Sequence, residues 1–233
     1  MKLHALLMCL ITLSCSPLKH NKPLSYLSGN WFNKIYLKTL IETRSPKAAN
    51  SAYIAYVQIT DNYIGRIYNF HESAGRETDS LISTNTRNIY TLNHYPSDTI
   101  QQIDNDNIIW KYNAGYGDID NIDLVRIREP ISTFINKVVV CGKYIDSIGN
   151  SYNFQETGSV FWVDSTFKYS ICLDLTFTDK DCMRLSLLDD SKVRLYGFSV
   201  DKNKLMLYRE LIKEHNDEGV FFESTPFLIL TKQ

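Results

Sequence analysis

The side chains that most often carry out catalysis are present in this chain, but their spacing does not bring them together. The four histidines beyond the N-terminal segment stand apart from one another and from any cysteine: His20, His71, His94 and His215. No two of them have the spacing that a zinc site needs. The sequence also contains no Gly-x-Ser-x-Gly elbow and no glycine-rich phosphate loop. We therefore predict that this protein is not an enzyme and holds no metal or cofactor.

Two groups of acidic residues come closer to a functional pattern, and neither completes one. The segment "GDIDNID" places Asp118, Asp120 and Asp123 close together. It lacks the regular aspartates, the glycine and the distant glutamate of a calcium loop, so we interpret it as a turn. Glu72 and Glu156 each end a Tyr-Asn-Phe-x-Glu phrase, which could suggest paired catalytic carboxylates. We expect each of them at the solvated end of a strand instead.

The first residues, "MKLHALLMCLITLSC", predict export from the cytoplasm. A short basic region around Lys2 precedes an apolar run over residues 5–13, and Cys15 follows almost at once. The run is far shorter than the roughly 20 residues of a membrane-spanning helix, and it matches the apolar core of a secretory signal. "TLSC" resembles a bacterial lipoprotein signal, in which the cysteine sulfur receives a lipid. The alternative is an ordinary secretory signal cut near Ser14 or Ser16.

The lipoprotein resemblance implies an address and a layout for the N-terminal segment. Residues 1–14 would be removed as a signal peptide, and 15–25 would form a polar tether between the lipid on Cys15 and the fold. Ser16, rather than an acidic residue, follows the cysteine, which by resemblance to enterobacterial lipoproteins implies the outer membrane. The expected location is the bacterial cell envelope. Three further cysteines, Cys141, Cys172 and Cys182, cannot all pair within one chain, and we expect buried free thiols.

Composition favours a β-protein without a nucleic-acid partner. The formal charge is -1, and no run of five basic residues occurs, so nothing attracts a polyanion over a long range. Fifteen tyrosines and eleven phenylalanines fit pleated surfaces. From about Ala52 onward, short strand-like runs alternate with turn clusters, which predicts antiparallel hairpins. The exception is residues 32–51, where helical spacing and the Ser45-Pro46 pair predict one or two short helices around Arg44.

Three patterns occur twice in the same order along the chain. "YNFHE" from Tyr68 returns as "YNFQE" from Tyr152, "DNDNIIWKY" from Asp104 returns as "DKNKLMLYR", and "DLVRI" corresponds loosely to "FLILT". We interpret them as two copies of one β-module, over residues 26–129 and 137–233, with the helices inserted in the first. The alternative is coincidence among strands of similar composition.

The entrances to the two copies carry a family resemblance. Gly29 to Trp31 and Gly142 to Tyr144 each place a glycine two residues before an aromatic side chain. Glycine-x-tryptophan in the first strand of an antiparallel meander resembles the lipocalin-like, or calycin, barrels, and the chain resembles small lipoproteins of this kind from Bacteroidetes. The resemblance implies two tandem barrels of about eight strands each. It also implies a barrel floor of Trp31 crossed by Arg126, with Arg128 as the alternative, and of Tyr144 beside Lys232.

A barrel of this size holds either a packed core or one small ligand. Our first hypothesis is that a barrel of this lipid-anchored protein binds a small apolar or amphipathic ligand. Five aromatic residues are the candidates for the pocket: Tyr68, Phe70, Tyr152, Phe154 and Trp162. The second hypothesis is a packed, non-enzymatic module that contacts an envelope protein or a glycan through its outer surface.

The lipid anchor can be tested directly in cells. Replacing Cys15 with alanine removes the sulfur that would carry the lipid, so the variant should move from the membrane fraction into the soluble periplasmic fraction. Fractionation with immunoblotting measures this, and Cys141→Ala serves as the matched control that should stay with membranes. A Cys15→Ala protein that still sediments after a carbonate wash would contradict the anchor.

Overall fold

The computed structural model describes residues 24–50, 54–60, 63–68, 79–113, 119–173, 178–187, 193–211 and 219–233. Within them the first sheet is formed by β1 (Gly29–Asn33), β2 (Tyr56–Thr60), β3 (Tyr63–Tyr68), β4 (Asp79–Ser83), β5 (Ile89–Leu92), β6 (Thr99–Gln102), β7 (Asn107–Asn113) and β8 (Ile119–Ile127). Each strand pairs antiparallel with the next. Because β1 pairs with both β2 and β8, the sheet closes into a barrel. The predicted all-β class with a closed antiparallel barrel is confirmed.

A second antiparallel sheet follows in the sequence. It is formed by β9 (Gly142–Ile145), β10 (Ser151–Phe154), β11 (Ser159–Trp162), β12 (Ser165–Ile171), β13 (Asp181–Leu187), β14 (Val193–Asp201), β15 (Lys204–Arg209) and β16 (Leu228–Lys232). The sheet curls back on itself, because β9 pairs with β10 on one side and with β16 on the other. The contact between β9 and β16 is short and involves only Ile145 and Tyr144 on β9.

Four helical segments accompany the sheets: η1 (Leu24–Leu27), α1 (Lys34–Thr43), α2 (Pro46–Ala49) and α3 (Ile131–Val139). The Asn33 side chain accepts a hydrogen bond from an amide of the first turn of α1, and Arg44 ends α1 in the left-handed conformation with φ of 55°. Ser45 caps α2 and Pro46 occupies its first turn. α3 was not predicted from the sequence, where residues 130–136 were only the gap between the two expected modules.

The interior of the first barrel is filled by apolar side chains. Trp31 and Trp110 are fully buried within it. The remaining members of the cluster are also buried: Leu27, Ile54, Val57, Ile59, Ile64, Leu81, Tyr90, Leu92, Ile100, Ile108 and Leu124. Because successive residues of a strand face opposite sides, Phe32 next to Trp31 points out of this barrel. The outer face of β1 therefore needs a cover of its own.

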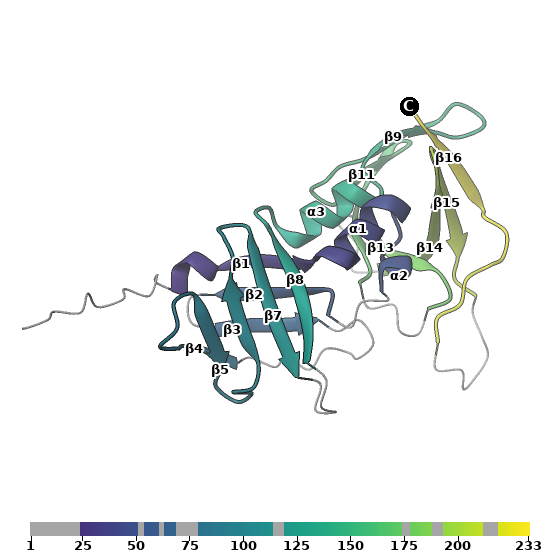
Figure 1. Ribbon diagram of the computed structural model, residues 1–233. Coiled ribbons are helices and arrows are strands. Elements are labelled where there is room, and N and C mark those ends of the chain that lie inside the picture. Colours follow the sequence, from purple (N-terminus) through teal and green to yellow (C-terminus); the bar gives the residue numbers. More distant parts are fainter. Residues whose placement is uncertain are drawn as a thin grey trace, which may run out of the picture.

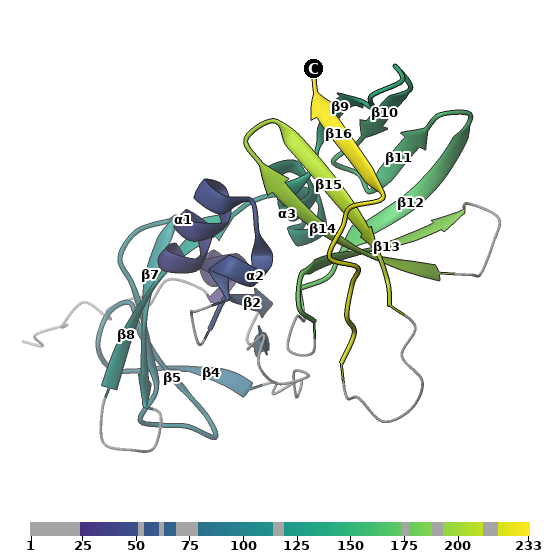
Figure 2. The same ribbon diagram turned by 90° about the vertical axis from the view of Figure 1, so that its right-hand side faces the viewer.

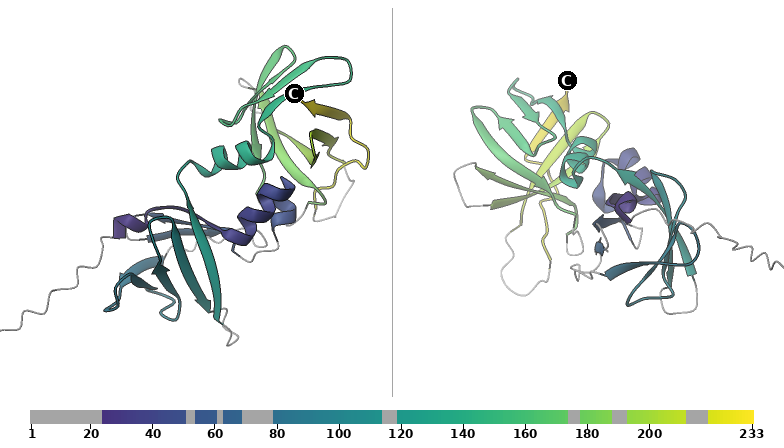
Figure 3. Two further views of the ribbon diagram at one scale, coloured as in Figure 1. Left: turned by 45° about the horizontal axis from the view of Figure 1, so that its top comes forward. Right: turned by 90° about the vertical axis from the view of Figure 1, so that its left-hand side faces the viewer.

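The helices provide that cover and join the two sheets. Figure 1 shows α1, α2 and α3 between the first sheet and the second, and the views in Figure 2 and Figure 3 agree. Phe32 and the α1 residues Tyr36 and Leu40 share one buried cluster with Ile135 and Val139 of α3. The same cluster continues into the second sheet. Burial of these side chains, each worth about 2 kcal/mol, holds the two halves together.

A buried carboxylate adds a polar contact between the halves. Asp181, the first residue of β13, accepts a hydrogen bond from the Ser45 hydroxyl at 2.5 Å and one from the Lys47 backbone amide at 2.7 Å. It thus binds the first turn of α2 from the other half of the chain. Burial raises the pKa of Asp181, against the opposing effects of the Ser45 and Lys47 hydrogen bonds.

The strand pairing corrects one correspondence that the sequence suggested. Tyr68 ends β3, the third strand of its sheet, whereas Tyr152 lies in β10, the second strand of its own. Tyr68 and Tyr152 therefore do not lie in equivalent strands, and the rest of the first phrase, residues 69–72, lies outside the described residues. The other correspondences agree with strand order: β7 and β15 each follow a polar turn, and β8 and β16 each close their sheet.

Removing the buried carboxylate should loosen α2 from the second sheet. Asp181→Ala leaves the Ser45 hydroxyl and the Lys47 amide without their acceptor, so we expect a loss of about 1–3 kcal/mol in the free energy of unfolding. Urea unfolding at pH 7 measures this, with the exposed Asp164→Ala as the control.

The pH dependence of the same pair gives a second readout. Since the folded state raises the pKa of Asp181, it binds this proton more tightly than the unfolded chain does. The contribution of this proton to the free energy of unfolding is fully present below the ordinary carboxyl pKa and is lost as the pH rises through the raised pKa of the folded state. The Asp181→Ala variant should not show this fall in unfolding free energy with pH. If Asp181→Ala leaves both the midpoint of urea unfolding and its dependence on pH unchanged, the contact with Asp181 does not hold α2.

Candidate functional site

The narrow ends of the two sheets have the same construction. In the first barrel, the indole Nε1 of Trp31 donates to the backbone oxygen of Leu27 at 2.8 Å. In the second, the hydroxyl of Tyr144 donates to the backbone oxygen of Val140, also at 2.8 Å. Both acceptors lie four residues before the aromatic residue, at the end of η1 and just after α3 respectively. A large buried ring with its polar atom satisfied closes each interior, and we call these two arrangements the floors.

A cation from the last strand crosses each floor. Arg126 on β8 pairs directly with Trp31, and its guanidinium carbon lies 4.4 Å from the centre of the indole ring. Lys232 on β16 pairs directly with Tyr144, and its ammonium nitrogen lies 6.0 Å from the centre of the phenol ring. The longer distance makes the second cation–π contact the weaker of the two.

The glycines of the two floors share one backbone conformation. Gly29 and Gly142 have the same backbone φ of +148°, a value that disfavours other residues. A Cβ on Gly142 would lie 2.6 Å from Cε of Lys232, so the lysine side chain would have to shift. A Cβ on Gly29 would lie 3.6 Å from Nε of Arg126, an ordinary contact distance, so at Gly29 the positive φ alone favours glycine.

Both cations also bind the chain that precedes the first strand of their sheet. The guanidinium of Arg126 donates to the backbone oxygen of Tyr26, and the Lys232 ammonium donates to that of Cys141 at 3.0 Å. Each cation thus ties the last strand to the helical segment that covers the floor. Burial lowers the pKa of Lys232, and the nearby guanidinium of Arg44 lowers it further.

Arg44 connects the first half of the chain to the floor of the second. Its Nε donates to the backbone oxygen of Val139 at 2.9 Å, and its Nη2 donates to the hydroxyl of Tyr144 at 3.2 Å. Val139 ends α3, so a cation there satisfies an otherwise open carbonyl. Burial raises the pKa of Tyr144, although the hydrogen bond from Arg44 opposes it. Arg44, at the end of α1, therefore supports the second floor from the first half of the chain.

A cavity of about 330 Å³ lies at the opposite end of the second sheet, which we call the mouth. The residues that line it are Trp162, Phe167, Leu185, Ser186, Leu187, Arg194 and Tyr196. Directly opposed residues of an antiparallel pair share a face, and Arg194 is opposite the core residue Leu185. Arg194 therefore belongs to the inner face of the sheet, at the rim of an aromatic pocket.

A second arginine lies near the mouth on the next strand. Arg209 is opposite Tyr196 across β14 and β15, and its guanidinium lies 4.8 Å from the ring centre of Phe227. The rings of Tyr196 and Phe227 are 5.6 Å apart. No carboxylate lines the cavity, and Arg194 has no ion-pair partner in the part of the chain that the structure describes. The mouth is thus aromatic on its walls and cationic at its rim.

Only part of the predicted aromatic set lies at this cavity. Trp162 lines it, and Tyr152 packs edge-on against Trp162 with ring centres 5.4 Å apart. Phe154 is fully buried near the floor, beside Tyr144. Tyr68 lies in β3 of the other sheet, and Phe70 and Cys15 fall outside the described residues.

Sequence reasoning missed Phe167, Arg194 and Tyr196 at the mouth. The alternation in "VRLYGF" did carry a signal, because Arg194, Tyr196 and Phe198 share one face. The face itself could not be assigned without the strand register.

The hydroxyl of Tyr152 donates to Asp146 at 3.0 Å, and burial together with this carboxylate raises the pKa of Tyr152 to about 12.

The remaining titratable residues form structural contacts. His94 lies 2.9 Å from the Asp79 carboxylate; burial pushes the Asp79 pKa up, but the His94 hydrogen bonds outweigh it and lower the pKa. Asp120 and Asp123, expected in a turn, lie in β8, where the ladder with β7 extends the strand. Among the described residues no group of three histidine, cysteine or acidic side chains could hold a metal ion.

The cysteines are free thiols: Cys141, Cys172 and Cys182. Cys172 and Cys182 lie side by side, with the backbone amide of Cys172 donating to the oxygen of Cys182 at 2.8 Å. The side-chain hydrogen bond that the Cys182 thiol shares with the Cys172 sulfur, followed by burial, raises the pKa of Cys182. The thiol of Cys182 is therefore kept protonated, which makes it a poor nucleophile.

Comparison with known proteins found no matching family model, no matching curated protein and no matching solved structure. None of the helices in the described part of the chain has the length and apolar character to cross a membrane.

The two arginines of β8 offer a test of which one matters to the first floor. Arg126→Ala removes the cation over Trp31 and the donor to Tyr26, so we expect a loss of about 1–3 kcal/mol in the free energy of unfolding. Arg128→Ala breaks only an exposed pair with Asp106, which should cost below about 1 kcal/mol. Chemical unfolding of both variants measures the difference. Equal losses of unfolding free energy in the two variants would show that Arg126 has no special role at the first floor.

Proposed function

We propose that this chain is a lipid-anchored envelope protein made of two tandem lipocalin-like modules. The proposal rests on the two floors, which combine a helical segment, a Gly-x-aromatic first strand and a cation from the last strand. It also rests on α1 and α2, which lie between β1 and β2 as an insertion in the first module. The lipoprotein-like segment that ends at Cys15 supplies the anchor, and the expected location is the outer membrane.

The function we propose is binding of a small amphipathic molecule at the mouth of the second module. The cavity of about 330 Å³ is the observation that carries it, because packed barrels leave no such space. Its volume lies near the lower end of the range that small-molecule sites span. The aromatic and aliphatic walls suit an apolar tail, which loses its contact with water on entering.

The charges at the mouth favour an anionic head group on that molecule. Arg194 stands at the rim and Arg209 lies nearby, and no carboxylate among the lining residues neutralises them. A carboxylate or sulfate can accept paired hydrogen bonds from a guanidinium, which gives both affinity and orientation. We propose that the head group binds Arg194 while the tail packs between Trp162, Phe167 and Tyr196.

The first module supports the alternative of a packed, non-enzymatic part. Its buried cluster around Trp31 and Trp110 fills the centre of the sheet. Its inserted helices contact Val139, Tyr144 and Asp181 of the second half. We propose that this module acts as a rigid spacer, which fixes the second module relative to the lipid and contributes no catalysis.

Binding can be measured on the soluble protein that begins after Cys15. Titration with dodecanoate, dodecanol and dodecyltrimethylammonium, followed by tryptophan fluorescence and calorimetry, should give affinities in that descending order. Arg194→Ala should weaken dodecanoate about tenfold or more, toward the dodecanol value, because a charged hydrogen bond of about 1.5–3 kcal/mol is lost. Trp162→Ala should weaken dodecanoate and dodecanol alike.

Arg87→Ala, on the first module, serves as the matched control, and circular dichroism checks the fold of each variant. If none of the three amphiphiles binds and native mass spectrometry of the purified protein shows no co-purified molecule, the ligand-binding function is wrong. If they bind in an order that ignores head-group charge, the role of Arg194 is wrong while the pocket stands.

A further inference from the structure

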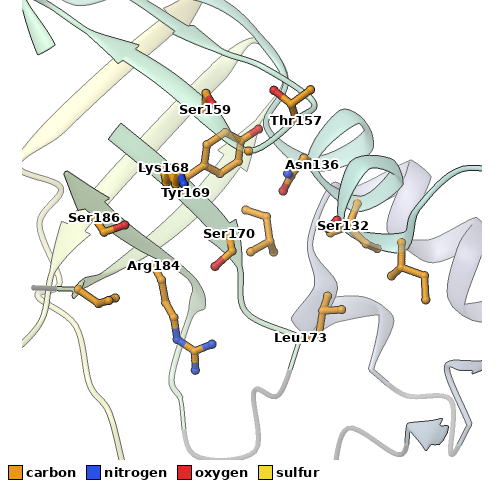
Figure 4. A pocket seen from close by; sticks show the side chains of 15 residues that line it. Ser132, Asn136, Thr157, Ser159, Lys168, Tyr169, Ser170, Leu173, Arg184 and Ser186 are labelled. Carbon is orange, nitrogen blue, oxygen red and sulfur yellow. The ribbon is translucent and has the colours of Figure 1, made fainter. Parts of the chain in front are cut away.

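A second, larger cavity of about 620 Å³ lies on the outside of the second sheet. Figure 4 shows it between α3, which contributes Ser132 and Asn136, and the strands β12 and β13. The strand register places it on the outer face. Lys168 is opposite Ser186 and Ser170 is opposite Arg184, whereas Tyr169 and Leu185 between them belong to the core. The cavity therefore lies mainly on the outer face, and Ser186 is the one residue that it shares with the lining of the mouth.

Two cations line this cavity, and neither is neutralised there. Lys168 and Arg184 occupy diagonal positions on paired strands, which puts their Cα atoms about 7–8 Å apart. Neither forms a salt bridge within the described residues, whereas Lys137 of the neighbouring α3 pairs with Glu129. No carboxylate is among the residues that line the cavity. One anionic group could thus contact both cations.

Hydroxyl groups surround the two cations. The side chains that supply them are Ser132, Thr157, Ser159, Ser170 and Ser186. Asn136 adds an amide that is held in place, because its nitrogen donates to the backbone oxygen of Glu156 at 3.1 Å. Each hydroxyl can both donate and accept, which suits a ligand that carries several hydroxyl groups of its own.

An apolar strip completes the lining. The side chains that form it are Ile131 and Ile135 on α3, Ile171 at the end of β12, Leu173 just beyond that strand, and Val193 at the start of β14. The C–H face of a sugar ring can pack on such a strip while its hydroxyls reach polar groups at the sides. A plain fatty anion would leave the hydroxyl groups unused, and inorganic phosphate would fill little of the volume.

We propose that this outer cavity binds an acidic sugar, with its carboxylate or phosphate group on Lys168 and Arg184. The ring hydroxyls bind the serine and threonine side chains and the Asn136 amide. This site does not depend on the proposed binding of an amphipathic molecule at the mouth, because Lys168 and Arg184 do not line the mouth and Arg194 does not line this cavity.

The test uses the soluble protein that begins after Cys15 and four probes: galacturonic acid, glucose 6-phosphate, galactose and inorganic phosphate. Calorimetry and NMR titration should show both acidic sugars binding with dissociation constants of about 1 mM or below, and galactose at least about tenfold more weakly. Affinity for the acidic sugars should fall as salt rises, since charges drive it.

Variants assign the binding to this cavity. The double variant Lys168→Met, Arg184→Met should lose about tenfold or more in affinity for both acidic sugars and keep its binding of dodecanoate. Ser170→Val should weaken the acidic sugars with both cations in place. Lys143→Met, an exposed lysine on β9 outside the cavity, is the matched control and should change nothing. Arg194→Ala should leave sugar binding intact.

Three outcomes would overturn the proposal. Absence of binding by both acidic sugars rules out the site. Equal binding of galactose and galacturonic acid removes the role of the two cations. Inorganic phosphate binding as tightly as glucose 6-phosphate, with Ser170→Val unaffected, would reduce the cavity to a simple anion site. None of these results bears on the mouth, whose test uses other ligands and other residues.

Discussion

An apolar barrel interior must be closed at one end, and in this protein an aromatic side chain does so in each sheet. The ring alone is insufficient, because its polar atom would be buried with no partner. Trp31 and Tyr144 solve this by donating to a carbonyl four residues earlier. That hydrogen bond fixes the angle at which the preceding helical segment enters the sheet. The cation from the last strand then binds both the ring and the segment, so the first and last strands are joined at the floor.

The two floors differ in what supplies their outer support. In the first, Arg126 reaches Tyr26 and the module closes with its own residues. In the second, Lys232 is the weaker partner, and Arg44 from the inserted α1 binds both Val139 and the Tyr144 hydroxyl. The second half therefore depends on the first for a partly buried cation and for the apolar cover of Phe32, Tyr36 and Leu40. Its opposite end is left free, and the mouth lies there.

Residue types and chain order pointed to the contact of Arg126 with Trp31, which the structure contains, and they gave no sign of the mouth. A glycine two residues before an aromatic, with a cation on the final strand, depends only on positions that the sequence displays. Ser45-Pro46 likewise marked the start of α2. Arg194 could not be assigned in this way, since a one-residue change in register would turn it outward. α3 was missed because residues 130–136 were treated only as the gap between two modules, although proline is common at the start of a helix. The outer cavity was missed because Lys168 and Arg184 are far apart in sequence and meet only through strand pairing.

The connection between β1 and β2 has a consequence for biosynthesis. Because α1 and α2 belong to the early part of the chain, they leave the ribosome before any strand of the second sheet does. The apolar surface that will cover part of the second sheet is thus already synthesised when that sheet begins to form. The order of the two sheets is therefore not interchangeable, because with the halves exchanged the second sheet would be synthesised before the helices that pack against it.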